Sequence, residues 1–434
     1  MASTLDPAFS PLLLTQASLN PCLALEVLPM GITLHRLFVQ ADGKTHDILI
    51  GPESPAGHLT QKYTNTIIGR YANRVPVPPA GTLPIARNGA SAEIAPRANE
   101  RPTVSLHGGL TGWDLTPWTP VLDTAVEADP AARVTLFTAA ELARVQAAIP
   151  AGAYAFFVRE SPDGEEGFPG RLRVEVLVAL LDARGRADGA RDGEWHLGSV
   201  LLVYRAKLLD GAVTAVNMTQ HWGFNLDASL QEGVSVRDHS LTIKADHTLA
   251  YLPDANSAGA LAPVAGTHHA HAEKTTRTIG ERFPENGYDE FYVFAPRPDA
   301  PVLPPPRVSE AELGPEADLL APALEARDPV VELAGAKSGL RVDFTTNQSG
   351  VQFYSNNFVD PKKTARKKIH GGSGEKGDGY EAGSAAFLEF HEPLAAWMHP
   401  DTLGPSRHDT LLAAGEVYNS FVRMDVWYRS QEGL

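Results

Sequence analysis

The sequence predicts an all-β protein, a large antiparallel β-sandwich with few short helices. Several segments alternate apolar and polar residues with a period of two, which is the pattern of a strand with one buried face. Convincing helical periodicity is scarce. The 434 residues include 38 glycines and 34 prolines, a composition that suits many short strands joined by turns. Together these observations favour packed antiparallel sheets.

Five segments carry the strand prediction. Apolar and polar residues alternate in Arg171–Val178, Leu340–Thr345 and Val422–Tyr428. Each of these three is expected to be a half-buried strand, with its polar residues on the exposed face. Val200–Leu208 and Glu290–Phe294 are also strand-like, since they are rich in aliphatic and aromatic residues.

One segment is predicted to be helical. Ala139–Ala148 has the best helical periodicity in the chain, and it lies between Pro130 and Pro150. A single short helix of this kind is compatible with an all-β fold.

The chain shows no fixed-period repeat and no clear linker, so residues 1–434 are expected to form a single domain with surface insertions. Residues 183–194 are polar and glycine-rich, and residues 296–306 hold six prolines, which excludes a central strand there. Residues 362–384 begin with the basic run Lys362–Lys368 and then become glycine-rich. That run either contacts an anion or forms a solvated, mobile loop, and the loop is the expectation.

The composition narrows the classes of partner. A formal net charge of −15 argues against binding to nucleic acid or to an anionic membrane surface. The only cysteine is Cys22, which excludes an intrachain disulfide and a cysteine-based metal site. The N-terminal residues contain no early positive charge and no long apolar run, so a cytoplasmic protein is expected. The sequence is silent on oligomeric state.

Several familiar catalytic motifs do not occur. The sequence has no glycine-rich dinucleotide fingerprint opening a helix, no P-loop, no Gly-x-Ser-x-Gly elbow and no His-Glu-x-x-His. Candidate chemistry therefore has to come from residues that are separated along the chain.

The segment Ala215–Leu226 contains the most informative histidine. His221 follows a strand-like stretch and lies among Asn217, Asn225 and hydrophobic neighbours. A histidine in such a setting gives or takes a proton near neutral pH. The alternative is a structural histidine that is simply hydrogen-bonded.

Two glycine-containing segments supply donors. In Ile68–Val75, the side chains of Arg70, Asn73 and Arg74 suit hydroxyls or an anion, although one arginine could equally form a structural ion pair. His107 precedes two glycines, which permit a tight turn and a close approach of the backbone to a ligand.

Two acidic residues and one histidine cluster complete the candidates. Asp289 either accepts hydrogen bonds from a polyol or caps a turn before the strand at Phe291. Glu389 becomes a better general base if it sits in a desolvated pocket, whereas on an exposed face it has no such role. The run His268–His271 either binds a metal through closely spaced imidazoles or forms a solvent-facing loop.

In combination, these segments resemble the aldose 1-epimerase (galactose mutarotase) family. Any single match would be weak, but the segments occur in the family's order over most of the chain. The matching segments are Gly69–Arg74, Leu106–Gly109, Ser161–Gly170, Asn217–Leu226, Gly287–Asp289, Gly350–Tyr354 and Leu388–Glu389.

The resemblance implies the large β-sandwich of that family, a galactose mutarotase-like supersandwich, with a sugar bound on a concave sheet face. It implies an isomerase that acts on a small-molecule sugar and needs neither a metal nor an organic cofactor. His221 would stand at the position of the general acid, and Glu389 at that of the general base. The substrate-binding residues expected are Arg70, Asn73, Arg74, His107, Trp222, Asn225, Asp289 and Gln352.

That assignment agrees with elementary sugar chemistry. To interconvert α and β anomers of a free hexose such as galactose or glucose, a base takes the proton from O1 while an acid protonates the ring oxygen O5. The ring opens to an aldehyde, the C1–C2 bond rotates, and the ring closes on the other carbonyl face with the roles reversed.

One residue departs from the family pattern. Gly223 stands where the family commonly has tyrosine, which removes a pocket wall and a hydroxyl, and Trp222 could replace that wall by stacking on a sugar face. The departure leaves two other functions open. The protein could act on a phosphorylated or unusual sugar, or it could be a non-catalytic sugar-binding or regulatory relative.

Overall fold

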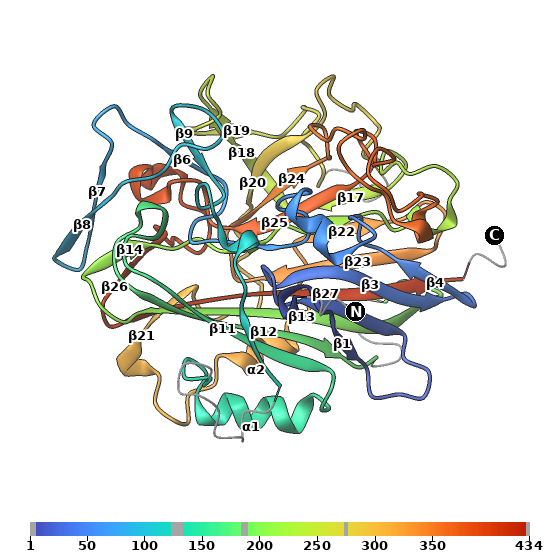
Figure 1. Ribbon diagram of the computed structural model, residues 1–434, viewed down its shortest axis with the longest axis horizontal. Helices are drawn as coiled ribbons and strands as arrows, with labels where there is room; N and C mark the ends of the chain where they lie inside the picture. The colour runs from blue at the N-terminus through green and yellow to red at the C-terminus, as the bar shows by residue number, and fades with distance from the viewer. Residues whose placement is uncertain (1–5, 123–132, 184–189, 273–276, 431–434) are drawn as a thin grey trace.

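The computed structural model describes residues 6–122, 133–183, 190–272 and 277–430. Two large sheets dominate this part of the chain, and only two α-helices accompany them (Figure 1). The predicted all-β sandwich is therefore confirmed. α1 (Ala139–Ala148) coincides with the predicted helix, and α2 (Leu320–Glu325) was not predicted.

The larger sheet has nine strands, and its ladders are antiparallel. All five strands expected from the sequence are present, four of them in this sheet and one in the next. The nine strands are β10 (Thr119–Val121), β11 (Tyr154–Ser161), β12 (Leu172–Leu181), β13 (Glu194–Leu208), β27 (Glu416–Arg429), β23 (Leu340–Thr346), β22 (Val331–Ala334), β17 (Ser240–Ile243) and β21 (Arg307–Ser309).

The expectation that three of these strands are half-buried is wrong. Every residue of β12 and β23 is buried, and so is most of β27. The alternation itself holds, but the polar face packs under α1, α2 and their flanking segments, where the charges pair with one another. Arg205 pairs with Glu141 of α1 at 2.7 Å, and Arg341 pairs with Glu194 at 2.6 Å. This ion-pair layer replaces solvent on the outer face of the sheet.

The second sheet has six strands and lies on the other side of the nine-stranded sheet from α1 and α2 (Figure 1). The apolar faces of the two sheets meet in the core, where the rings of Phe344 on β23 and Phe390 on β25 lie 5.0 Å apart. The six strands are β16 (Gly223–Phe224), β25 (Ala386–His391), β24 (Gly350–Tyr354), β20 (Asp289–Phe294), β18 (Ala245–Tyr251) and β19 (Ser257–Pro263).

Smaller sheets complete the structure and bring distant segments together. A four-stranded sheet comprises β1 (Leu12–Thr15), β2 (Leu23–Leu28), β3 (Thr33–Ala41) and β4 (Lys44–Asp47). The two-stranded pairs are β14 (Val213–Ala215) with β26 (Leu411–Ala413), β15 (Thr219–Gln220) with β5 (Ile67–Ile68), β6 (Arg74–Pro76) with β9 (Val104–Leu106), and β7 (Leu83–Arg87) with β8 (Ala90–Ile94).

The three predicted insertions have different outcomes. Residues 296–306 form no strand, as their prolines predict. Part of the 183–194 segment, residues 184–189, lies outside the described residues. The solvated loop expected for Lys362–Lys368 is wrong at Lys367, which is fully buried and donates hydrogen bonds to Asp47 and two backbone carbonyls. Whether the chain is a single domain stays a prediction.

None of the helices in the described ranges is both long and apolar enough to cross a membrane.

Candidate active site

A cavity of about 570 Å³ lies over the six-stranded sheet and gathers seven of the predicted site residues. They come from β6, β20, β24 and β25 and from the irregular positions 73, 107 and 221 beside short strands. The seven are Asn73, Arg74, His107, His221, Asp289, Gln352 and Glu389.

Strand pleating sets which residues of the sheet face the cavity. Glu389 on β25 lies directly opposite Gln352 on β24, and both side chains point to the same side. Their neighbours Leu388 and Phe390 point the other way, into the core. The glutamate is nevertheless only 2% exposed, because residues of other segments line the cavity around it.

His221 is fixed by the short pairing of β15 with β5. Its backbone N–H donates to the carbonyl of Thr66 at 2.9 Å, and its carbonyl accepts from the N–H of Asn65 at 2.8 Å. The imidazole packs against the ring of Phe387, with 4.8 Å between ring centroids. These contacts hold the ring at the edge of the sheet with Nε2 facing Glu389.

His107 enters the cavity from the tight turn that its two glycines predict. His107 itself is left-handed, with φ of 53°, and a Cβ added to Gly108 would come within 2.1 Å of the carbonyl oxygen of Gly69. The N–H of Asn73 donates to His107 Nδ1 at 3.2 Å. Because Nδ1 is the acceptor, Nε2 of neutral His107 carries the ring proton and acts as a donor.

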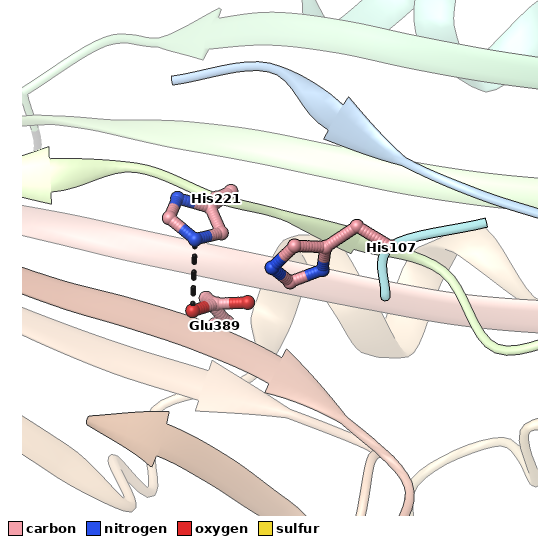
Figure 2. A group of neighbouring side chains, drawn as sticks. All are labelled: His107, His221 and Glu389. Carbon is pink, nitrogen blue, oxygen red and sulfur yellow. Dashed lines mark ion pairs between the residues drawn. The ribbon is translucent and has the colours of Figure 1, made fainter. Parts of the chain in front are cut away.

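His221 and Glu389 are in direct contact. Figure 2 shows their side chains turned toward each other with His107 alongside, and His221 Nε2 lies 3.2 Å from Glu389 Oε1. Burial raises the pKa of Glu389 well above its ordinary value, and the negative charge of Asp289 acts in the same direction. Burial lowers the pKa of His221 to about 4. These two shifts place a single proton shared by the pair on Glu389.

A polar network spans the cavity next to this pair. Asn73 Nδ2 donates to Gln352 Oε1 at 3.0 Å, and Gln352 Nε2 donates to Asp289 Oδ1 at 2.7 Å. Arg74 makes a two-pronged contact with Glu100 at 2.8 and 2.9 Å and lies 3.4 Å from Asp289. The network fixes several donors and acceptors in place before a ligand enters, which is the arrangement that recognises several hydroxyls at once.

Three predicted sugar contacts lie away from the cavity. Arg70 is buried and binds Ser161 and the backbone carbonyls of residues 162 and 168–170. Trp222 points into the core and packs against Phe224 and Phe344, because it alternates with His221 along the chain. Asn225 binds the carbonyl of Ser384 and the N–H of Asp227. Each position therefore has structural contacts in place of the expected contact with a sugar.

Other cavity residues were not found from the sequence. Phe387 lies two residues before Glu389 on β25, so a period-two argument could have placed it on the same face. Tyr63 lies against His107, with 4.7 Å between ring centroids, and Glu100 binds Arg74. These two lie in irregular segments that offer no periodic signal. The cavity is also lined by Tyr354 and Tyr380.

The cavity trio resembles a two-histidine, one-carboxylate metal site. The potential ligand atoms of His107, His221 and Glu389 lie within 4.8 Å of one another. Ligation through His107 Nε2 would require its proton to move to Nδ1 and would break the hydrogen bond from Asn73, so the donor set is poorly suited to a metal. Across the described ranges, the histidines of His268–His271 do not converge into a comparable group.

Comparison with known proteins places these features in a family. The family model described as "Aldose 1-epimerase" matches residues 20–425. The chain belongs to the aldose 1-epimerase family. It is accordingly an isomerase, as the sequence predicts.

Known relatives of this aldose 1-epimerase cover most of its length. It is 29% identical to the galactose mutarotase of Bos taurus over 92% of this chain and 89% of that protein. It is 24% identical to the aldose 1-epimerase of Escherichia coli over 88% of this chain and 85% of that protein. A solved aldose epimerase homologue from C. elegans has the same fold, with a TM-score of 0.65 and 18% identity. The match covers 97% of this chain and 100% of that one.

Gly223 departs from the family's tyrosine, and Phe387 occupies the space. The two residues face each other across β16 and β25, and a Cβ at position 223 would lie 2.6 Å from the Phe387 ring. Phe387 lines the cavity beside His221. The missing wall is thus supplied by the neighbouring strand, and the expectation that Trp222 replaces it is wrong.

A tyrosine at position 223 is expected to be tolerated only when Phe387 is shortened. Gly223→Tyr should drive the Phe387 ring against His221 and lower kcat/KM on hexoses by ~10²-fold, since small displacements of catalytic groups have effects of that size. Combining it with Phe387→Ala should restore most of the loss, as measured by polarimetry. The Phe387→Ala variant alone is the control, and wild-type activity in Gly223→Tyr would contradict this account.

Proposed function

We propose that this aldose 1-epimerase interconverts the α and β anomers of free hexoses, with Glu389 and His221 as its acid–base pair. The observation that carries the proposal is the direct contact of these two side chains inside a cavity lined by fixed hydrogen-bonding groups. One group takes a proton from O1 while the other gives one to O5, so the chemistry requires two titratable side chains within the span of one pyranose.

Ring opening begins when Glu389 is a carboxylate and His221 is an imidazolium. Glu389 takes the O1 proton, the C1–O5 bond breaks as C1=O1 forms, and O5 takes the proton of His221. The pair is then protonated Glu389 and neutral His221. Their pKa directions favour this state, because burial makes the carboxylate a stronger base and the imidazolium a stronger acid. The site therefore favours the open-chain stage, the least stable form of the sugar.

Closure runs the same steps backward after the C1–C2 bond has rotated. His221 takes the proton from the O5 hydroxyl, O5 attacks the other face of C1, and Glu389 returns a proton to O1. The Nε2–H donor of His107 suits the ring oxygen or the aldehyde oxygen, while Asn73, Gln352 and Asp289 suit the remaining hydroxyls. Each ring-opening or ring-closing step couples two proton transfers to the breaking or making of the C1–O5 bond, and the pair regains its starting protonation at the end of the cycle.

A phosphorylated hexose fits the cavity less well. Arg70, one of the cations expected to serve a phosphate, is taken up by backbone carbonyls outside the cavity. Arg74 is already paired with the carboxylates of Glu100 and Asp289, which would repel a phosphate dianion. A neutral sugar is therefore the better substrate.

Polarimetry on freshly dissolved α-galactose and α-glucose tests the proposal. The protein should accelerate the approach to anomeric equilibrium above the rate in buffer, and glucose 6-phosphate should not compete more strongly than glucose. Sugar binding by calorimetry without any acceleration would instead indicate a non-catalytic sugar-binding protein.

The acid limb of the kcat/KM pH profile should lie near pH 4 and not near the 6.5 of an ordinary histidine. The active pair carries one proton. Because the pKa of His221 is lowered to about 4, a second proton binds, and activity falls, only as the pH drops to that region. Because the pKa of Glu389 is raised, the last proton is lost only well above 4.5. Polarimetry from acid to alkaline pH, with circular dichroism to verify folding, measures both limbs. An acid limb centred near 6.5 would refute the assignment.

A further inference from the structure

The segment that carries His221 runs antiparallel to β25, which carries Glu389. At one end of this pairing, Gly223 lies opposite Phe387. Continuing the register by two residues places His221 directly opposite Glu389, in agreement with the 3.2 Å between their side chains (Figure 2). The distance between the proposed acid and base is therefore set by the spacing of these two segments.

Beside the acid–base pair, the backbone pairing of the two segments stops. The last backbone hydrogen bond between them runs from the Leu388 N–H to the Trp222 carbonyl at 3.2 Å. β15 pairs with β5 instead. In the part of the chain that the structure describes, no backbone hydrogen bond joins residues 217–221 to residues 389–392. The pair thus lies where the ladder has opened.

The side chain of Asn217 closes the open end of this ladder. Asn217 is fully buried, its Oδ1 accepts from the Glu392 N–H at 3.1 Å, and its Nδ2 donates to the Glu392 carbonyl at 3.0 Å. An amide that meets both the N–H and the C=O of one residue reproduces the two bonds that a residue of an antiparallel strand would exchange there. The side chain therefore joins the two segments on the far side of His221 and Glu389.

The backbone of Asn217 brings a third segment to the same point. Its carbonyl accepts from the Ala72 N–H at 2.6 Å, and its N–H donates to the Arg70 carbonyl at 3.1 Å. From Ala72 the chain continues directly to Asn73 and Arg74, which line the cavity. One buried asparagine thus connects two polar cavity residues with both strands of the acid–base pair.

We propose that Asn217 is a positioning residue, which holds His221 and Glu389 at the separation that spans the O1 and O5 atoms of one pyranose. This inference rests on the proposed function. Asn217 does not line the cavity, so it acts through the pair and not on the sugar. His391 Nδ1 also donates to the Glu392 carbonyl, at 2.7 Å, so that carbonyl keeps a donor without Asn217. The loss is then mainly that of the link between the segments.

Asn217→Ala tests the proposal, with Asn419→Ala as its matched control. Polarimetry on fresh α-glucose and α-galactose should show kcat lowered by ~10–10²-fold with little change in KM, because displacing catalytic groups by about 1 Å has effects of that size. Asn419 is also buried and donates to the Pro305 carbonyl at 2.9 Å, but it lies on β27 and does not line the cavity. Its alanine variant should keep the kcat of the wild type. Circular dichroism verifies that both variants fold.

Asn217→Asp adds a pH dependence that a merely structural role would not give to the kcat of folded protein. A protonated carboxyl keeps both an acceptor and a donor for Glu392, whereas a carboxylate turns an oxygen toward the carbonyl oxygen. Burial raises the pKa of the introduced carboxyl above its ordinary value of about 3.9. Relative to wild type, kcat should thus be nearly normal at mildly acid pH and fall as the pH rises. Measuring wild type at each pH accounts for other groups, such as Glu392, whose pKa burial raises to about 7.

The outcomes separate this inference from the proposed function. Absence of turnover in wild type defeats the proposed function, and crystal structures of wild type and Asn217→Ala then test the positioning role without a sugar. The distance from His221 Nε2 to Glu389 Oε1 should exceed the 3.2 Å of the wild type in the variant, and an unchanged distance would overturn the role.

With turnover present, three results would count against the positioning role. They are equal kcat losses in Asn217→Ala and Asn419→Ala, a loss confined to KM, and a kcat ratio of Asn217→Asp to wild type that is constant with pH. If Asn217→Ala does not fold, the pH dependence of Asn217→Asp decides.

Discussion

Glu389→Gln is expected to lower kcat for hexose anomerisation by ~10²–10⁴-fold, the usual contribution of a positioned base. The amide keeps the shape of the side chain and can still donate to His221 Nε2, but it cannot take the proton from O1. The proposed hydrogen bonds of Gln352 and Asp289 with the sugar are unaffected by this change, so KM should change little. Polarimetry gives both constants.

A matched control for this variant lies on β20, which is separated from β25 by β24 in the same sheet. Glu290→Gln makes the same chemical change at a partly buried carboxyl that does not line the cavity, and its activity should be that of the wild type. His221→Ala should lose activity on the same scale as Glu389→Gln. Equal rates for wild type, Glu389→Gln and His221→Ala would refute the acid–base assignment.

Lys367→Ala is expected to have the largest effect on stability, lowering the free energy of unfolding by ~3–5 kcal/mol. Lys367 and Asp47 have no exposed side-chain area, and Lys367 Nζ lies 2.7 Å from Asp47 Oδ2. Removing the ammonium leaves a buried carboxylate and the carbonyls of His35 and Leu49 without this donor. Denaturant unfolding measures the loss.

The neighbouring residue provides the control for this second prediction. Lys368 is exposed, and its hydrogen bond to Glu53 comes from the backbone N–H, which alanine keeps. Lys368→Ala should therefore change the free energy of unfolding by no more than ~0.5 kcal/mol. Because Tyr380 lines the cavity and accepts a hydrogen bond from the Lys367 N–H, the segment that Lys367 anchors also supports the cavity wall. Similar stabilities for the two lysine variants would contradict the assignment of Lys367 as the residue that anchors this segment.

The sequence led to the strands and to the proposed acid–base pair for different reasons. Period-two alternation located β12, β23 and β27, but it could not reveal that α1 and α2 cover their polar faces, since that depends on tertiary packing. His221 and Glu389 were reached through the family resemblance and the needs of the chemistry. Their meeting at 3.2 Å depends on pairings of strands that are far apart in the sequence.

The errors in the predicted site follow from the direction of side chains. Trp222 was placed beside a sugar although it is adjacent to His221, and neighbouring residues in an extended chain point to opposite sides. Arg70 and Arg74 are equally polar in sequence, and only the fold decides that the first binds backbone carbonyls while the second faces the cavity. Residues in irregular segments, such as Tyr63 and Glu100, had no pattern to identify them.

The ion-pair layer between the nine-stranded sheet and its helices has a consequence for warm conditions. Withdrawing charges such as Arg205 and Glu141 from water is unfavourable, but this penalty shrinks on heating because hydration of ions becomes less favourable as temperature rises. The burial of apolar side chains does not become comparably more favourable on heating. The side of the molecule remote from the sugar should thus contribute a growing share of the resistance to thermal unfolding as the temperature increases.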